Sequence, residues 1–154
     1  MFKRSYIKRE VIIGIMRILY KGNIESDFEG FNENAIFKMT DGTYWLQSQY
    51  VYWYHYAYMP TAVIIQENGR TILTVKGHSV PVEQLYNVIE SRIDGTFEGW
   101  QGNTKYKLTN GQIWEQVVYK YQYKYSHRPV ATIANVNGSY IMSVAGTQAV
   151  VKRI

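Results

Sequence analysis

The feature that most constrains the fold of this chain is an internal repeat. Residues 19–85 align with residues 88–154 at a constant offset of 69, without a gap, and 23 of the 67 aligned pairs are identical. Such a repeat encodes one structural unit twice, so a fold assigned to one copy has to serve for the other. We therefore divide the chain into a basic N-terminal segment (1–18), a first repeat (19–87) and a second repeat (88–154).

Each repeat has the pattern of short strands separated by turns. Asp41-Gly42 lies over Asn110-Gly111, and Asn68-Gly69 lies over Asn137-Gly138. Asn-Gly and Asp-Gly are typical of type I′ hairpin turns, in which both central residues have a positive φ. In the first repeat we expect strands over 19–30, 34–40, 43–57, 61–67, 70–76 and 79–85, and the second repeat follows 69 residues later.

This pattern predicts a mainly β fold made of two small units in tandem. A straight strand over residues 43–57 would span about 50 Å, which is more than the width of such a unit. This strand therefore has to bend, coil across two sheets or break near its end. A highly bent barrel of the SH3-like kind is the first expectation for each unit, and a flatter pseudo-symmetric sandwich is the alternative. The sequence leaves open whether the repeats form two barrels or share one sheet. Because small units bury little surface alone, we expect the two to pack together.

The N-terminal segment has a helical period instead. Ile7, Val11, Ile15 and Ile18 recur at helical spacing, with cations elsewhere around the wheel. Residues 5–20 are expected to form an amphipathic helix that covers one end of the barrel pair. The glycine and β-branched residues in this segment oppose a helix.

Composition excludes several kinds of site. The chain has no cysteine, which excludes disulfides, thiolate zinc sites and thiol catalysis. The apolar run 11–19 is too short to span a membrane and is interrupted by Arg17, and no secretory signal is evident. A soluble cytoplasmic protein without membrane partners is the resulting expectation.

The net charge of +5 is unevenly distributed along the chain. Residues 1–18 carry a net charge of +4, and residues 88–154 carry eight cations against four anions, again +4. Residues 19–85 carry four cations against seven anions, a net charge of −3. The basic character is therefore confined to the two ends, around an acidic first repeat.

The sequence does not indicate an enzyme. A duplicated active site should keep its catalytic groups in both copies, but His55 lies over Lys124, His78 over Thr147 and His127 over Tyr58. No zinc-protease, serine-hydrolase or phosphate-binding glycine motif is present. The matched pairs Glu29/Glu98 and Gln47/Gln116 are expected to form hydrogen bonds at bends and strands. We predict no catalytic residue, no cofactor site and no metal site.

Tyrosines alternate along matching stretches of both repeats, and we call them the tyrosine rows. The first row is Tyr50, Tyr52, Tyr54, Tyr56 and Tyr58, and the second is Tyr119, Tyr121, Tyr123 and Tyr125. The favoured interpretation is a half-buried sheet face with cross-strand aromatic packing. The alternative is an exposed aromatic platform for bases, sugars or a partner protein.

The residues between the tyrosines differ between the two repeats. The first repeat has Val51, Trp53, His55 and Ala57 at these positions. Val51, Trp53 and Ala57 form an apolar patch that we expect to be covered by the N-terminal helix, by the other repeat or by another subunit. The second repeat has Lys120 and Lys124, followed by Arg128, and a cationic row beside aromatics suits a phosphate backbone with stacked bases. The corresponding ordinary interpretation is a solvated strand face.

Three motifs of the second repeat belong together: Ile89-Glu-Ser-Arg-Ile-Asp-Gly-Thr-Phe-Glu-Gly-Trp100, then Lys107-Leu-Thr-Asn-Gly-Gln-Ile-Trp-Glu-Gln116, and then a Tyr-X-Tyr-X-Tyr run followed by Pro129. With these motifs the second repeat resembles a family of uncharacterised small bacterial proteins, and similar sequences occur among the products of mobile integron gene cassettes. The first repeat departs from it, with Ile24-Glu-Ser-Asp27 and with Phe31 in place of the tryptophan. The resemblance implies a small, soluble, bacterial protein and assigns no catalytic residue.

These observations predict a binding or assembly module rather than a catalyst. The first hypothesis is a protein partner or self-association, through an interface of Tyr50, Trp53, Tyr54, His55, Tyr121 and Tyr123. The second hypothesis is nucleic-acid binding through Lys120, Lys124 and Arg128, together with Lys3, Arg4, Lys8 and Arg9 of the N-terminal segment.

Overall fold

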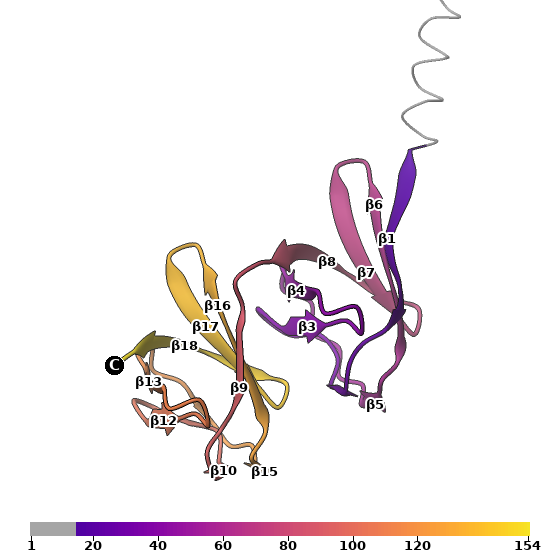
Figure 1. The fold of residues 1–154 in the computed structure, drawn as a ribbon. Helices are drawn as coiled ribbons and strands as arrows, with labels where there is room; N and C mark the ends of the chain where they lie inside the picture. Colours follow the sequence, from indigo (N-terminus) through magenta and orange to yellow (C-terminus); the bar gives the residue numbers. More distant parts are fainter. Residues whose placement is uncertain (1–14) are drawn as a thin grey trace, which may run out of the picture.

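The computed structural model describes residues 15–154, and these residues form β-strands and no helix (Figure 1). The first unit contains β1 (Met16–Asn23), β2 (Asp27–Phe28), β3 (Ile36–Lys38), β4 (Tyr44–Gln47), β5 (Ala57–Tyr58), β6 (Thr61–Glu67), β7 (Arg70–Val75) and β8 (His78–Leu85). The second unit contains β9 (Ile89–Arg92), β10 (Thr96–Phe97), β11 (Trp100–Gln101), β12 (Lys105–Lys107), β13 (Ile113–Gln116), β14 (Tyr121–Gln122), β15 (Ser126–His127), β16 (Val130–Val136), β17 (Ser139–Val144) and β18 (Thr147–Arg153). The prediction of a mainly β chain is confirmed.

Each unit is built on its own six-stranded antiparallel sheet. The strand order is β1-β6-β7-β8-β4-β3 in the first unit and β9-β16-β17-β18-β13-β12 in the second. The edges of the first sheet meet where Ile24 bridges Met39, and Ile93 bridges Leu108 at the same place in the second sheet. Among the described residues no strand of one unit pairs with a strand of the other. The chain therefore holds two curled sheets and not one shared sheet.

The two units also have separate hydrophobic cores that use equivalent positions. The largest core side chains of the first unit recur 69 residues later in the second, as Phe28/Phe97, Phe31/Trp100, Met39/Leu108, Trp45/Trp114, Ile64/Ile133 and Leu73/Met142. Strands β6 to β8 supply alternate side chains to the first core, and β16 to β18 do so for the second, as expected for a sheet with one face buried. Figure 1 shows the units side by side in the same orientation, with the β6–β7 and β16–β17 hairpins pointing the same way.

The hairpin turns are of two kinds. Asn68-Gly69 has φ angles of 54° and 74°, and Asn137-Gly138 has 52° and 88°, which confirms the type I′ prediction at this position. At Asp41-Gly42 only the glycine has a positive φ, 87°. Gly42 N donates to Met39 O at 2.9 Å and Met39 N to Thr43 O at 2.9 Å, a type I turn followed by a bulge. The type I′ prediction is wrong there, and the Asp41 side chain stabilises the observed turn by accepting a bond from Thr43 N at 2.9 Å.

Two further expectations are wrong. The predicted helix over residues 5–20 is not formed in its described part, because residues 16–20 belong to β1, where Ile18 pairs with Ile65 of β6. The β-branched residues that oppose a helix are well suited to this strand. Residues 1–14 lie outside the described part of the chain. The predicted strand over residues 43–57 ends at Gln47, and between Gln47 and Ala57 the only β-bridge to another described residue is the one between Trp53 and Phe31.

Candidate binding surface

The hydrogen bonds of a buried glutamine fix the path of the chain from the end of β4 into the first tyrosine row. The side chain of Gln47 is 1% exposed, and its Nε2 atom donates to the carbonyls of Asn32, Gln49 and Val51. Its Oε1 atom accepts a bond from Asn32 N at 2.9 Å. In the second unit Gln116 Nε2 donates to Val118 O at 3.1 Å and to Lys120 O at 2.9 Å. These side-chain bonds replace the ladder bonds that an ordinary strand would have, which confirms the prediction that the matched glutamines form hydrogen bonds.

A glycine lets each tyrosine row cross over the segment before β3 or β12. Phe31 N donates to Trp53 O at 2.7 Å, and Trp53 N donates to Phe31 O at 3.1 Å. A Cβ atom on Gly30, whose φ is 91°, would lie 1.9 Å from Trp53 O. On Gly99, with a φ of 94°, it would lie 2.0 Å from Gln122 O. The Phe-Glu-Gly motif of both repeats therefore ends in the residue that this close crossing requires.

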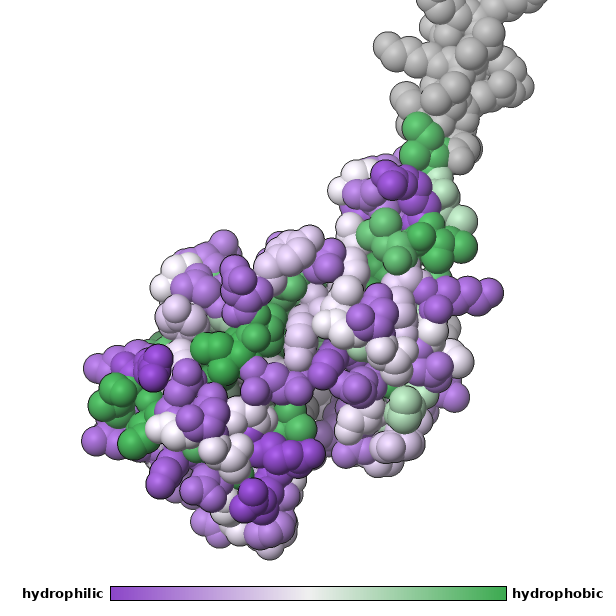
Figure 2. All heavy atoms as spheres, viewed as in Figure 1, coloured by the Kyte–Doolittle hydropathy of each residue, from purple (hydrophilic) through white to green (hydrophobic). Residues whose placement is uncertain are grey.

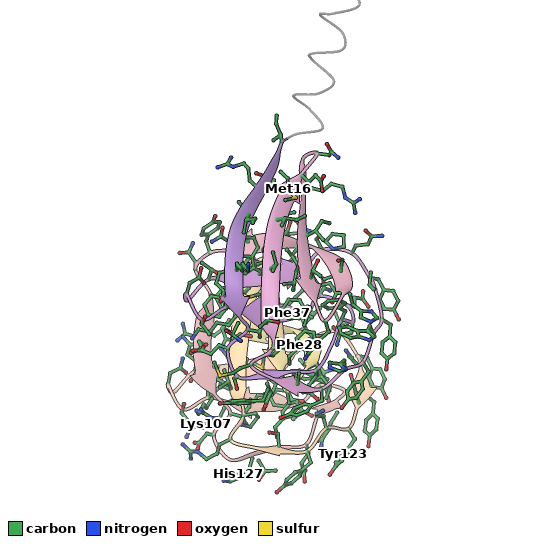
Figure 3. All side chains as sticks on the ribbon, turned by 90° about the vertical axis from the view of Figure 1, so that its right-hand side faces the viewer. Met16, Phe28, Phe37, Lys107, Tyr123 and His127 are labelled. Atoms are coloured by element: carbon green, nitrogen blue, oxygen red, sulfur yellow. The ribbon has the colours of Figure 1, made fainter. Side chains whose placement is uncertain are left out.

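All nine tyrosines of the two rows are exposed. Their exposed fractions lie between 55% for Tyr56 and 81% for Tyr119. The favoured interpretation of a half-buried tyrosine face is therefore wrong, and the alternative of an exposed aromatic platform is correct in geometry. An extended backbone sends successive side chains to opposite sides, and the inward side is taken by the residues between the tyrosines. In Figure 3 Tyr123 lies at one side of the molecule and Lys107 at the opposite side.

The inward side of the first row packs on its own unit. Val51 and Trp53 contact the hydrophobic core of the first unit. The Trp53 ring is stacked between His55, at 5.1 Å between centroids, and His78 of β8, at 3.9 Å. The apolar patch that was expected to need covering by another element or subunit is therefore covered within its own unit. Of the predicted interface residues, Tyr50, Tyr54, Tyr121 and Tyr123 face outward, whereas Trp53 and His55 belong to the inward side.

The predicted cationic row is not an open row of charges. Lys120 Nζ donates to Gln148 O at 2.7 Å, and burial lowers the pKa of Lys120, with Glu33 acting in the opposite direction. Lys124 Nζ lies 2.6 Å from Glu29 Oε1, and Arg128 Nη1 lies 4.0 Å from Asp94 Oδ1. All three side chains have partners within the chain, because the bend of the segment sends them to different neighbours. Lys3, Arg4, Lys8 and Arg9 lie outside the described residues.

The two tyrosine rows meet at a cleft between the units. The cleft has a volume of about 750 Å³, and Tyr56 of the first row and Tyr125 of the second both line it. Its first wall carries Glu25, Asp27 and Glu29 of the first unit, and its second wall carries Arg92, Lys124 and Arg128 of the second unit. The acidic and basic repeats of the sequence thus face each other across this cleft.

Polar contacts at the edge of the cleft tie the units together. Lys38 Nζ lies 2.9 Å from Glu25 Oε2 and 3.1 Å from Glu90 Oε1. Tyr44 OH donates to Glu90 Oε1 at 2.8 Å. The hydrogen bond to Glu25, together with Glu90, raises the pKa of Lys38 despite some burial. Burial alone would raise the pKa of Glu90, but the bonds from Tyr44 and Lys38 outweigh it and lower that pKa. Asn32 Nδ2 completes the junction by donating to Gly146 O at 2.8 Å.

Comparisons with known proteins provide no evidence on the function of this chain. Searches against protein-family models, curated proteins and solved structures give no match. Across residues 15–154 no helix is long and apolar enough to cross a membrane. In the same part of the chain no three His, Asp or Glu side chains lie close enough to hold a metal ion.

Proposed function

We propose that this chain is a non-catalytic binding module whose two tyrosine rows bind an extended segment of a partner protein. The observation that carries the proposal is the exposure of all nine row tyrosines, each by more than half of its surface. Soluble proteins rarely leave large contiguous apolar patches open, and such patches mark interaction sites. The tyrosines recur at matching positions in both repeats, while the residues between them differ.

Tyrosine is well suited to binding an extended chain. It offers a large rigid ring at a low cost in side-chain entropy, together with a hydroxyl group that can form hydrogen bonds. Alternate residues of an extended segment lie about 7 Å apart, so the five tyrosines of the first row span about 27 Å. A partner that follows one row reaches the cleft, where Tyr56 and Tyr125 lead to the other row.

The charges near the rows favour a protein over a nucleic acid. Lys120 and Lys124 are bonded within the chain, and Arg128, with its side chain 51% exposed, lies 4.0 Å from an Asp94 carboxylate oxygen. Asp27 accepts a hydrogen bond from Tyr56 OH at 2.8 Å, so a carboxylate lies beside the first row. A phosphate backbone would require free cations at this place. Nucleic-acid binding is therefore the second candidate and an outcome of the test below.

The remaining proposals concern the type and origin of the protein. Six short antiparallel strands that curl until their edges meet support a small barrel of the SH3-like kind for each unit. The motifs of the second repeat support membership of the integron-cassette family, and we expect a bacterial cytoplasmic protein.

Replacement of row tyrosines tests the proposal. The double variant Tyr121→Ser/Tyr123→Ser removes two exposed rings, 69% and 65% exposed, and should leave folding unchanged. The matched control is Tyr86→Ser, which removes a 72% exposed tyrosine outside the rows. The wild type and both variants are used to capture partners from a bacterial lysate, with and without nuclease and at low and high salt.

The proposal predicts one partner protein that survives nuclease and high salt, is captured by the Tyr86 variant, and is lost with the double variant. Equal capture by all three proteins would contradict it. Material recovered only without nuclease, and lost at high salt, would establish the nucleic-acid alternative.

A further inference from the structure

The two units contact each other through different faces. We define the hairpin face of a unit as the outward side chains of its three long strands. In the first unit these are Val63, Ile65, Ile72, Thr74, Ser79 and Pro81, and in the second unit Thr132, Ala134, Ile141, Ser143, Gln148 and Val150. We define the end face as the outward side chains of the two short strands. In the first unit these are Ile36, Lys38, Tyr44 and Leu46, and in the second unit Lys105, Lys107, Ile113 and Glu115.

The junction covers the hairpin face of the second unit and the end face of the first. Ala134, Ile141, Ser143 and Gln148 are 1%, 6%, 9% and 6% exposed although they point away from their own core. Leu46 is 2% exposed and likewise lies outside the core of its unit. The bonds from Lys38 and Tyr44 to Glu90 fall at the same place. The contact is therefore head-to-tail, in agreement with the equal orientation of the units in Figure 1.

A head-to-tail contact leaves one face of each kind free, and the two free faces differ in chemistry. The free end face of the second unit carries Lys105, Lys107 and Glu115, the last of which stands in the place of Leu46. The free hairpin face of the first unit keeps Val63, Ile65 and Ile72, all partly exposed. Such an apolar face, at positions whose equivalents are covered in the second unit, marks a docking surface. Figure 2 shows hydrophobic residues exposed at this end of the first unit, over β1 and the β6–β7 hairpin.

We infer that the hairpin face of the first unit binds the same face of a second copy of this chain, about a two-fold axis. Its apolar centre runs across three strands in register, with Ile18 of β1 opposite Ile65 and Ile65 opposite Ile72. Ile18 is 59% exposed and Met16 is 52% exposed, so β1 extends the apolar surface to the edge of the sheet. A two-fold interface requires a self-complementary surface, which this continuous apolar row provides.

Charge complementarity at the rim agrees with this arrangement. Glu67 and Arg70 are opposite each other at the end of the β6–β7 hairpin. A two-fold axis through the apolar row can bring Glu67 of each copy beside Arg70 of the partner subunit. This pair adds one charge of each sign to the rim, so that each copy can form ion pairs with the other.

The same comparison of covered and free faces argues against a head-to-tail contact between two molecules. In the internal junction Lys38 binds Glu90. At the equivalent intermolecular contact Lys107 of one molecule would face Lys21 of the next, because these residues stand in the places of Lys38 and Glu90. Two like charges, together with a glutamate in the place of Leu46, oppose that contact. Assembly through the hairpin face therefore ends at a dimer and does not continue into a filament.

Sedimentation and crosslinking of the full chain test the inference. We expect a species of twice 18.0 kDa that dissociates on dilution. Ile65→Lys and Ile72→Lys should raise the dimer dissociation constant at least tenfold, whereas Ile113→Lys on the free end face should leave it unchanged. Because the chain has no cysteine, a short bismaleimide reagent that spans about 10 Å between facing sheets should crosslink Ile72→Cys into a dimer, and it should not crosslink Ile113→Cys.

The cysteine variants keep the test decisive if a lysine variant fails to fold. A single 18.0 kDa species at every concentration would overturn the inference, including the case in which another segment of the same chain covers this face. A dimer that persists with either lysine variant folded, or that crosslinks through Ile113→Cys instead, would overturn it as well.

Discussion

Lys124 Nζ lies 2.6 Å from Glu29 Oε1, and this ion pair joins the second tyrosine row to the segment that precedes β3. Glu29 Oε2 also occupies the space in front of Gly146, 2.7 Å from where a Cβ atom on that glycine would lie. The carboxylate is thus held between a cation and a glycine turn of the second unit. The Glu29 side chain is only 17% exposed, so the pair is shielded from water on the glutamate side.

We predict that Lys124→Met lowers the free energy of unfolding by about 1 kcal/mol, because it leaves the Glu29 carboxylate partly buried without its partner. The matched control is Lys152→Met, which breaks the more exposed pair between Lys152 and Glu115, 3.7 Å apart, and should cost less than about 0.5 kcal/mol. Urea unfolding of both variants measures the difference. Equal costs would show that Glu29 gains nothing from its shielding.

The alternation along the first row predicts opposite outcomes for neighbouring residues. Trp53→Ala removes a ring that packs on the core between His55 and His78, and should cost about 3 kcal/mol. Tyr54→Ala removes a ring that is 61% exposed, and should change stability by less than about 0.5 kcal/mol. Thermal unfolding of the two variants checks the pair. A large loss of stability for Tyr54→Ala would place the tyrosine row inside the fold.

Alanine should be tolerated less well at the glycines where a tyrosine row crosses another segment than at the glycines of the hairpin turns, although φ is positive at both. Gly30→Ala and Gly99→Ala put a Cβ atom within about 2 Å of a backbone oxygen and should abolish the folded state of their unit or destabilise it by several kcal/mol. At Gly42 and Gly111 a Cβ atom meets nothing within 4 Å, so alanine there should cost only about 1 kcal/mol of backbone strain. Circular dichroism melting curves of the four variants test this. Similar losses at all four positions would mean that φ alone, and not the crossing, requires glycine.

Local pattern predicted the parts of the fold that depend on near neighbours in the sequence. The strands expected over 61–67, 70–76 and 79–85 agree with β6, β7 and β8 within one residue, because each alternates inward and outward residues between Gly-containing turns. The repeat offset anticipated the equivalent core positions, since identical spacing presents the same face. The tyrosine row has the same alternation as a strand, so its period could not reveal that buried Gln47 leads it away from the sheet.

The orientation of the site residues depended on contacts between distant segments. Lys120, Lys124 and Arg128 share a spacing that predicts one solvated face in a regular strand. Lys124 instead pairs with Glu29, 95 residues earlier in the chain. The opposite charges of the two repeats are one sequence signal of this junction, but they identify no specific pair. A second signal is Leu46 on the end face of the first unit, because this residue is apolar and its equivalent in the second repeat is Glu115.

Glu90 gives the junction a predictable dependence on pH. Tyr44 and Lys38 hold the pKa of Glu90 below its usual value in the folded chain, despite the opposing effect of burial. A carboxylate with a lowered pKa contributes stability that is fully present above its unfolded pKa of about 4.3 and is lost as the pH falls through the lower folded value.

The melting temperature of the wild type should therefore fall between about pH 5 and pH 3. Glu90→Gln should start from a lower melting temperature at neutral pH and fall less steeply on acidification. Scanning calorimetry at intervals of pH measures the two slopes, and equal slopes for Glu90→Gln and the wild type would mean that the Tyr44–Glu90–Lys38 contact does not stabilise the folded chain.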